Sequence, residues 1–236
     1  MSRPTDKVRR EGGSVVIVGV GALGAAAALE LAAAPDDTVA HLRIVDGDRV
    51  EISNLHRQML HETEDLGRLK AAVAGEKLAR LRSPAVEIRA ERLTTANVRE
   101  ILSGMTVAVD ATDDAATKFL LNDACVAAGI PLVHAGVTGL AGQVLTILPH
   151  GGPCLRCLFP DPPTEGETTS CRDGGILGPV AGFVGILEAR AALEVLRGEA
   201  RPRLLRFDGR ALTLRSTEPR PLPGCTVCNS SIRETA

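Results

Sequence analysis

The segment Gly19–Gly24 most constrains what this chain can fold into, because three glycines in the pattern Gly-x-Gly-x-x-Gly separate two apolar runs. Residues 14–18 are mostly β-branched, which predicts a buried strand, and the alanine-rich residues 22–33, which end before Pro35, predict a helix. Glycines permit a tight turn here and let backbone amides at the helix N-terminus approach a phosphate. The segment therefore predicts nucleotide binding, although close packing of the helix on the strand would alone explain the glycines.

The apolar residues 15–34, which include the glycine turn, also resemble a signal peptide or a membrane span, because Lys7, Arg9 and Arg10 precede them. We reject that interpretation, since the run contains three glycines and Glu30. The expected protein is soluble and cytoplasmic, with no membrane partner.

Apolar runs and helical periods alternate along most of the chain. Strands are expected at 42–45, 86–90, 106–109, 132–135 and 143–148, and helices at 66–81, 96–102 and 114–128. The polar residues 46–64 between them predict an irregular loop. This βαβ order predicts an α/β fold, Rossmann-like, in which helices cover both faces of a mostly parallel sheet.

The pattern changes after Pro149. Residues 151–175 are rich in Pro, Gly and Thr and predict a long loop without an apolar period. A buried helix is expected at 176–196, although its glycines weaken that prediction, and a hairpin of 204–207 and 211–214 is expected around Asp208-Gly209. A proline-rich tail, 219–228, follows.

Composition excludes two classes of nucleic-acid-binding protein. Aromatic residues make up only 2% of the chain, with no Trp or Tyr, so it offers few rings on which single-stranded bases could stack. The formal net charge of −2 supplies no basic field for a duplex. No nucleic-acid partner is expected.

Acidic and basic residues after the second strand favour ATP over NAD. Asp46 follows that strand, about 20 residues after the last glycine, where an acid typically binds ribose hydroxyls. Asp48, Arg57, Lys70 and Asp113 come next, a set that suits a polyphosphate and a metal ion. A dehydrogenase needs a hydride-accepting pocket with an acid or base, and the second half of the chain shows none.

Four of the six cysteines form two Cys-x-x-Cys pairs, Cys154/Cys157 and Cys225/Cys228. Four thiolates in two knuckles suit a tetrahedral structural zinc ion and indicate a reducing compartment, with two redox pairs as the alternative. Cys171 lies beside Arg172 in the long loop and is a candidate nucleophile. Cys125 is expected to be a small core residue, and His134 and His150 to be structural or surface residues.

At these residues the chain resembles the ThiF/MoeB/HesA adenylyltransferases, relatives of ubiquitin-activating enzymes. The resemblance covers about residues 14–228 and rests on the glycine turn, Ser53–Gln58, Lys70, Thr112-Asp113, both cysteine pairs and Gly178-Pro179. It implies one adenylation domain over residues 1–236. Its nucleotide-binding part would span about 14–150, its crossover loop about 151–175, and its helix, antiparallel hairpin and zinc knuckle 176–236.

The resemblance implies an enzyme that uses ATP and Mg²⁺ to adenylate the C-terminal glycine of a small ubiquitin-like sulfur-carrier protein ending in Gly-Gly. Asp46 would bind the ribose, Asn54, Arg57 and Lys70 the phosphates, and Asp113 the magnesium ion. The expected nucleotide site is Gly19, Gly21, Gly24, Asp46, Asp48, Asn54, Arg57, Gln58, Lys70 and Asp113. The expected catalytic residues are Arg57, Lys70, Asp113 and Cys171, and the expected zinc ligands are Cys154, Cys157, Cys225 and Cys228.

Two positions depart from the family pattern. Asp114 stands where the family usually has Asn, which adds negative charge beside Asp113. The second departure is at the N-terminus: the family usually has a longer N-terminal helix whose arginine reaches into the partner subunit's active site, whereas here 13 residues precede the first expected strand, with Arg3, Arg9 and Arg10 as the candidates. The resemblance also implies a homodimer. The alternative functions are a catalytically weak or inactive subunit that docks a ubiquitin-like protein, an NAD(P)-dependent oxidoreductase, and relatives that modify a peptide carboxylate or a tRNA base.

Overall fold

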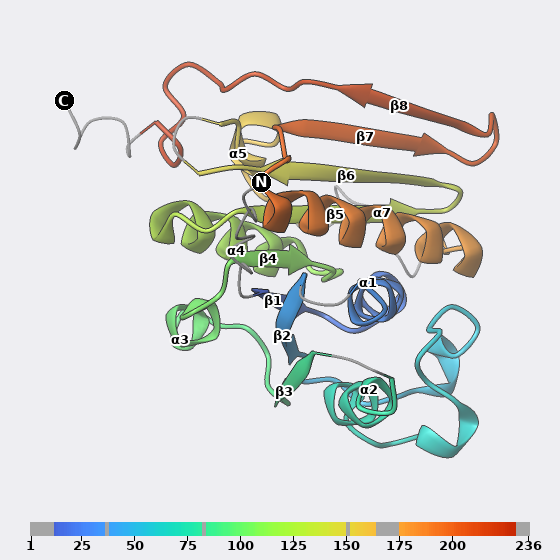
Figure 1. Ribbon diagram of the computed structural model, residues 1–236. Coiled ribbons are helices and arrows are strands. Elements are labelled where there is room, and N and C mark those ends of the chain that lie inside the picture. Colours follow the sequence, from blue (N-terminus) through green and yellow to red (C-terminus); the bar gives the residue numbers. More distant parts are fainter. Residues whose placement is uncertain (1–11, 36–37, 82–83, 150–151, 164–174, 230–236) are drawn as a thin grey trace, which may run out of the picture.

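Figure 1 shows the computed structural model, which describes the chain except for residues 1–11, 36–37, 82–83, 150–151, 164–174 and 230–236. The eight described strands form one sheet in the order β3-β2-β1-β4-β5-β6-β7-β8. Pairing is parallel from β3 through β5 and antiparallel from β5 through β8. The predicted α/β fold with an antiparallel C-terminal extension is confirmed.

The elements follow the predicted order. The strands are β1 (Gly13–Val18), β2 (Val39–Val45), β3 (Ala85–Arg89), β4 (Val107–Asp110), β5 (Leu132–Thr138), β6 (Ala141–Ile147), β7 (Arg203–Asp208) and β8 (Thr213–Thr217). The helices are α1 (Ala22–Ala32), α2 (Lys70–Leu78), α3 (Val98–Leu102), α4 (Ala115–Ala128), α5 (Leu155–Leu158) and α7 (Gly178–Arg197), with 3₁₀ turns η1 (Ile52–Asn54) and η2 (Thr63–Asp65).

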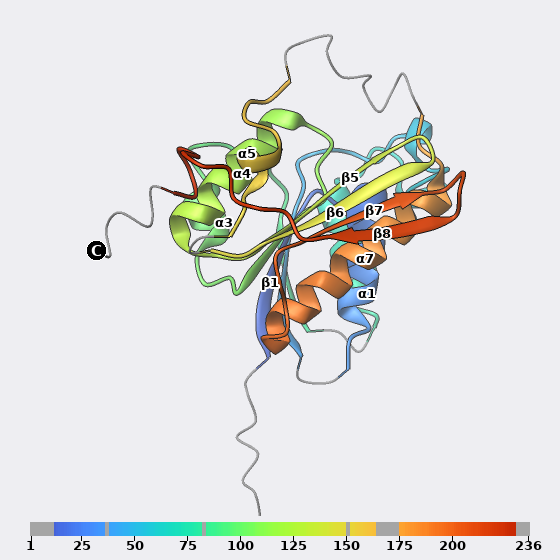
Figure 2. The same ribbon diagram turned by 90° about the horizontal axis from the view of Figure 1, so that it is seen from above.

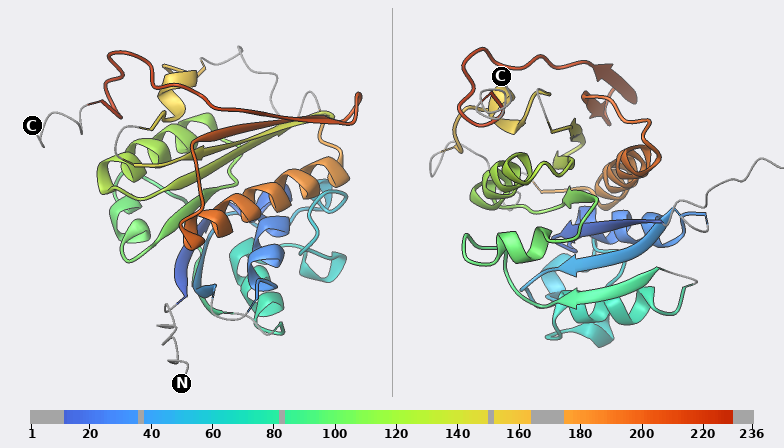
Figure 3. Two further views of the ribbon diagram at one scale, coloured as in Figure 1. Left: turned by 45° about the horizontal axis from the view of Figure 1, so that its top comes forward. Right: turned by 60° about the vertical axis from the view of Figure 1, so that its left-hand side comes forward.

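Helices cover both faces of the sheet, with α1, α2 and α7 on one face and α3, α4 and α5 on the other (Figures 2 and 3). The central strand β1 is buried from Val15 to Val18, as a parallel strand covered on both faces must be. Alternate residues of β1 therefore enter two separate apolar cores, Val15 and Ile17 on the α1 side and Val16 and Val18 on the α4 side.

The glycines of α7 lie where this helix closely approaches other segments. A Cβ on Gly185 would lie 2.3 Å from the carbonyl oxygen of Leu23 in α1, so only glycine permits the contact between the two helices. Pro179 stands in the first turn of α7, where its missing N–H costs nothing. The buried helix predicted for this region is confirmed.

Three local predictions were wrong. The helix expected to begin at residue 66 begins at Lys70, because Gly67 has a φ of +79° and Leu69 bridges back to Arg49. The last strand begins at Thr213, because Asp208 accepts hydrogen bonds from two amides and so extends the turn. Part of the expected loop after Pro149 forms the short helix α5, and its Leu155 is buried.

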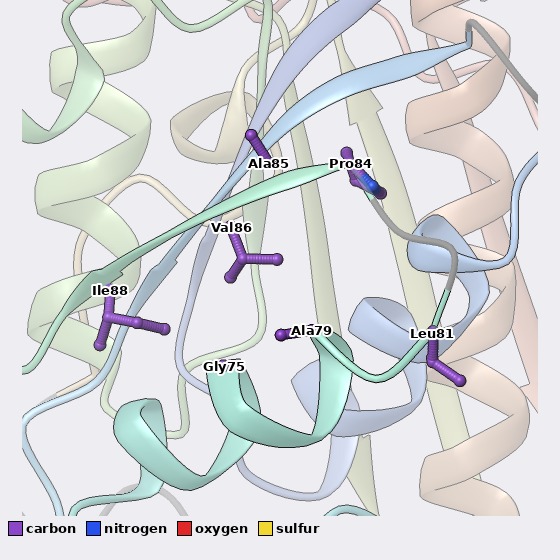
Figure 4. Close-up of a pocket in the computed structure, with 7 residues that line it drawn as sticks. All are labelled: Gly75, Ala79, Leu81, Pro84, Ala85, Val86 and Ile88. Carbon is purple, nitrogen blue, oxygen red and sulfur yellow. The ribbon is translucent and has the colours of Figure 1, made fainter.

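Among the described helices, none combines the length and apolar composition needed to cross a membrane. One apolar pocket of about 310 Å³ lies between α2 and β3, at the edge of the sheet (Figure 4). Its walls are Gly75, Ala79, Leu81, Pro84, Ala85, Val86 and Ile88. None of the described residues that line this pocket is ionisable, so they offer no acid, base or phosphate-binding cation.

Candidate active site

The glycine turn lies at the carboxyl end of β1, where strand order reverses between β2 and β4. Gly19 has a φ of +86°, and a Cβ on Gly24 would lie 1.9 Å from the carbonyl oxygen of Gly19. Side chains are thus excluded at both positions. Gly21 caps α1 without a side-chain hydrogen bond, so the first amides of the helix stay available to an anion.

Asp46 ties the glycine turn to the loop that follows β2. Its Oδ2 accepts a hydrogen bond from the Val20 amide at 2.8 Å, and its Oδ1 accepts one from the Asp48 amide at 2.8 Å. Burial nevertheless raises the pKa of Asp46 above its usual value, outweighing these two bonds. Asp46 therefore has a scaffolding role in addition to any contact with a ribose.

Asp48 lies between two cations. Its Oδ2 is 3.3 Å from Nζ of Lys70, and its Oδ1 is 2.7 Å from Nη2 of Arg92. Burial acts to raise the pKa of Asp48, but Lys70 and Arg92 outweigh it and hold that pKa below its usual value. The Lys70 amide also donates to the Asp48 carbonyl at 2.9 Å, so the start of α2 is fixed to this loop.

Arg92, between β3 and α3, is a residue that the sequence did not point to. The hydrogen bond to Asp48 raises the pKa of Arg92, and the charges of Asp46 and Asp113 raise it further. Its ion pair with Asp48 places the Arg92 guanidinium beside the loop that carries Asp46 and Asp48. A single arginine in a polar stretch carries no sequence signal, because its partner Asp48 is far away in the chain.

The loop after β2 also carries Asn54, Arg57 and Gln58, three residues of the expected nucleotide site. The Arg57 guanidinium donates to Oδ1 of Asn54 and, at 3.2 Å, to the Ser53 carbonyl. The next residue, Gln58, is buried beside Gly21, and its Oε1 has no hydrogen-bond partner in the described part of the chain. A buried polar atom of this kind is a candidate ligand contact.

His61 belongs to the same loop and had no predicted role. Its ring is buried, its Nε2 lies 3.5 Å from the Lys70 carbonyl, and its Nδ1 lacks a partner among the described residues. Burial lowers the pKa of His61, so its neutral form is favoured.

Asp113 lies in the turn between β4 and α4, where it is exposed and makes no ion pair or hydrogen bond with the described residues. Asp114 is instead engaged as the N-cap of α4, where its Oδ2 accepts from the Thr117 amide at 2.7 Å. The same oxygen accepts from the Thr117 hydroxyl, and this bond and then the amide bond lower the pKa of Asp114. A free carboxylate suits a hard cation such as Mg²⁺, so Asp113 is the member of the pair that fits this role.

The four paired cysteines converge, although the two pairs lie far apart in the sequence. Sulfur–sulfur distances are 4.0 Å for Cys154/Cys157, 3.7 Å for Cys154/Cys225 and 3.4 Å for Cys157/Cys228. All four sulfurs lie within 4.8 Å of one another. Tetrahedral zinc with Zn–S bonds of about 2.3 Å needs sulfurs about 3.8 Å apart, so the cluster fits a zinc knuckle that joins the tail to α5.

The structure therefore brings the glycine turn, Asp46, Asp48, Gln58, Lys70 and Asp113 to one region at the carboxyl ends of β1, β2 and β4. Arg57 and Asn54 pair beside it, and the cysteine cluster is separate. Cys171, His150 and the candidate N-terminal arginines Arg3, Arg9 and Arg10 lie outside the described residues. Cys125 is a buried core residue, as expected, and His134 is buried within β5.

Comparison with known proteins agrees with this geometry. The model of the ThiF family matches residues 4–227. The chain is 42% identical to the sulfur carrier protein adenylyltransferase of Thermus thermophilus, covering 95% of this chain and 85% of that protein. It is 42% identical to the SAMP-activating enzyme E1 of Haloferax volcanii, with coverage of 91% and 79%.

Two further matches cover less of the other protein. The chain is 41% identical to the adenylyltransferase and sulfurtransferase MOCS3 of Anopheles gambiae over 92% of its own length but spans only 50% of that relative. The solved structure of Escherichia coli MccB with ATP matches with a TM-score of 0.77 at 20% identity, over 94% of this chain and 68% of that one. At that identity the likeness concerns the fold alone.

Proposed function

Because the chain belongs to the ThiF family, we propose that it is an ATP-dependent adenylyltransferase. Its substrate would be the C-terminal glycine carboxylate of a ubiquitin-like sulfur-carrier protein, and pyrophosphate would be released. The observation that carries the proposal is the cluster of two cations, Lys70 and Arg92, around Asp48 beside the glycine turn. The names of the Thermus and Haloferax relatives support the substrate class.

The glycine turn and the α1 N-terminus would hold the phosphates through backbone amides, and Asp46 would bind the ribose. One oxygen of the carrier carboxylate attacks the α-phosphorus. The bond from that phosphorus to the oxygen bridging to the β-phosphorus breaks, and the electron pair leaves with pyrophosphate. The product is an acyl-adenylate.

Negative charge grows on the departing pyrophosphate, so the cations of the site act there. Lys70 is held by Asp48 before any substrate binds, and Arg57 is held by Asn54. Groups fixed in place cost no reorganisation when the charge develops, which makes them effective in stabilising it. When bound by Asp113, a magnesium ion would add positive charge at the phosphates.

Three further parts belong to the proposal. Zinc in the cysteine cluster would be structural, because four thiolates leave no open coordination position. A homodimer with a partner arginine at each site follows from the family resemblance. Cys171 would act after adenylation: its thiolate would attack the carbonyl carbon of the acyl-adenylate and form a thioester, with AMP as the leaving group. The single adenylation domain would span residues 1–236.

The test is ATP–pyrophosphate exchange with Mg²⁺ and each small protein ending in Gly-Gly encoded near this one. We expect exchange that depends on one such protein and is lost in Asp113→Ala. Saturable ATP binding without exchange for any carrier would contradict the proposal and favour a docking subunit or a peptide substrate. Failure to bind ATP, with retention of NAD(P), would favour the oxidoreductase.

A further inference from the structure

A buried acid–histidine pair lies directly before the turn that carries Asp113. Asp110 is the last residue of β4, and His134 is its register partner on the neighbouring parallel strand β5. The His134 Nδ1 lies 2.7 Å from Oδ2 of Asp110, and both side chains are almost completely buried. Neither residue belongs to the proposed set of nucleotide contacts.

The charge states of this pair follow from its surroundings. Burial acts to raise the pKa of Asp110, but Lys118, 3.5 Å away, and His134 outweigh it and hold that pKa well below its usual value. Burial and then Lys118 lower the pKa of His134. Both pKa shifts favour a carboxylate at Asp110 and a neutral ring at His134. A carboxylate can only accept, so the hydrogen in the 2.7 Å contact belongs to Nδ1.

The other oxygen of Asp110 fixes the turn. Its Oδ1 accepts hydrogen bonds from the Thr112 amide at 3.2 Å and from the Thr112 hydroxyl at 2.7 Å. At the far end of the turn, Asp114 caps α4 through Thr117. Asp113 thus stands between two anchored carboxylates, and the orientation of the Asp110 carboxylate determines where one of these anchors lies.

We infer that His134 is a positioning residue for Asp113, acting through Asp110 and Thr112. The inference rests on the proposed function, in which Asp113 binds the magnesium ion. Without the His134 donor, Asp110 keeps a buried lone pair unpaired, and its carboxylate turns toward Lys118 or admits water. Either change moves the acceptor of both Thr112 bonds, so the Asp113 oxygens lose their preset position.

Variants can separate this role from simple packing. His134→Asn keeps an N–H group near the place of Nδ1, whereas His134→Val suits a strand but removes the donor. Thr112→Val removes the hydroxyl bond to Asp110 without touching β5. A matched control is His41→Val, because His41 in β2 also faces a carboxylate, Glu87 at 3.4 Å, but lies near the start of its strand, away from the site.

The direct measurement is Mn²⁺ binding, followed by electron paramagnetic resonance, to the full chain in the presence of a non-hydrolysable ATP analogue. Partners of metal ligands typically change metal affinity 10–100-fold when removed. Since His134 acts on Asp113 only through Asp110 and Thr112, we expect the low end of this range. The Kd for Mn²⁺ should rise about tenfold in His134→Val and Thr112→Val. We expect less than a twofold change in His134→Asn and His41→Val, with thermal unfolding recorded for every variant.

Two results would overturn the inference while leaving the proposed function intact. One is wild-type Mn²⁺ affinity in both His134→Val and Thr112→Val. The other is an equal loss in His134→Asn and His134→Val, since that would assign the effect to the imidazole shape rather than to its N–H. A wild-type protein that binds no Mn²⁺ with the nucleotide would contradict the proposed metal role of Asp113 as well.

Discussion

The ammonium group of Lys70 lies 3.3 Å from the carboxylate of Asp48, and only 9% of the Lys70 side chain is exposed. A charged side chain this buried is rarely tolerated without a partner or a function. Here Asp48 supplies the partner, and the position of Lys70 at the start of α2 aims it at the loop that also holds Asp46.

Lys70→Met should therefore reduce carrier-dependent ATP–pyrophosphate exchange by about 100-fold or more, the usual cost of removing one preorganised charge donor. Lys77→Met is the matched control, because Lys77 lies on the same helix and pairs with Asp65 at 2.7 Å, away from Asp48. Exchange rates and melting temperatures should be measured for both. Equal losses of exchange in the two variants would contradict a specific role for Lys70.

The start of α7 leads to a second prediction. A Cβ on Gly178 would lie 2.9 Å from the His56 carbonyl oxygen and 3.3 Å from Cα of Arg57, both backbone atoms that cannot move aside cheaply. Gly178→Ala should displace the Arg57 loop and raise the KM for ATP about tenfold. Gly182→Ala should leave the KM nearly unchanged, because its Cβ would meet only the flexible Met59 sulfur at 3.4 Å. An unaltered KM in Gly178→Ala would show that the loop tolerates the displacement.

The cysteine cluster leads to a third prediction, which concerns zinc content. Cys225→Ser should abolish the single zinc ion per chain that elemental analysis is expected to find, whereas Cys125→Ala should retain it. Cys125 is a buried core residue outside the cluster. Because metal binding contributes folding free energy, we also expect a chelator to lower the melting temperature of the wild type but not of Cys225→Ser. Full zinc content in Cys225→Ser would refute a four-cysteine site.

Glu188 leads to a prediction about pH. It is completely buried in α7, and neither carboxylate oxygen has a hydrogen-bond partner in the described part of the chain. Burial, with a smaller contribution from Asp110, raises its pKa well above the usual value against the opposing charge of Lys118. A group with a raised folded-state pKa binds a proton on folding. The stabilisation that Glu188 contributes is therefore complete at pH values below its pKa in the unfolded chain. It is lost as the pH rises through its pKa in the folded chain.

The free energy of unfolding should therefore fall as pH rises from about 5 to 7, by at most about 1.4 kcal/mol per pH unit from this one proton. Glu188→Gln should flatten that dependence in urea titrations at several pH values. Glu194→Gln is the control, because Glu194 lies on the same helix but pairs with Arg203. Parallel pH profiles for the wild type and Glu188→Gln would contradict the buried-acid interpretation.

Much of the fold could be predicted from the sequence because its signals are local. The apolar run before Gly19 and the alanine-rich run after Gly24 define β1 and α1 by residue type alone. The cysteine spacing likewise predicts a cluster without any knowledge of the path between the pairs. Where a turn depended on one side chain, as at Asp208, the strand boundary was misplaced.

The rest of the site could not be predicted because it depends on contacts between distant segments. Arg92 is placed by its ion pair with Asp48, 44 residues earlier in the chain. The pairing of Asp110 with His134 follows from the strand register. A histidine inside an apolar strand was the one available signal for that pair, but it does not reveal the partner.

The most direct test of the central claim is the intact mass of the carrier after incubation with this protein, ATP, Mg²⁺ and pyrophosphatase. Adenylation predicts a carrier heavier by one adenylyl group, located by fragmentation at its C-terminal glycine and removed by hydroxylamine. The modified species should be absent with Asp113→Ala and with a carrier that lacks the last glycine. An unmodified carrier under conditions in which the protein binds ATP, or an adenylyl group elsewhere on the carrier, would contradict carboxylate adenylation.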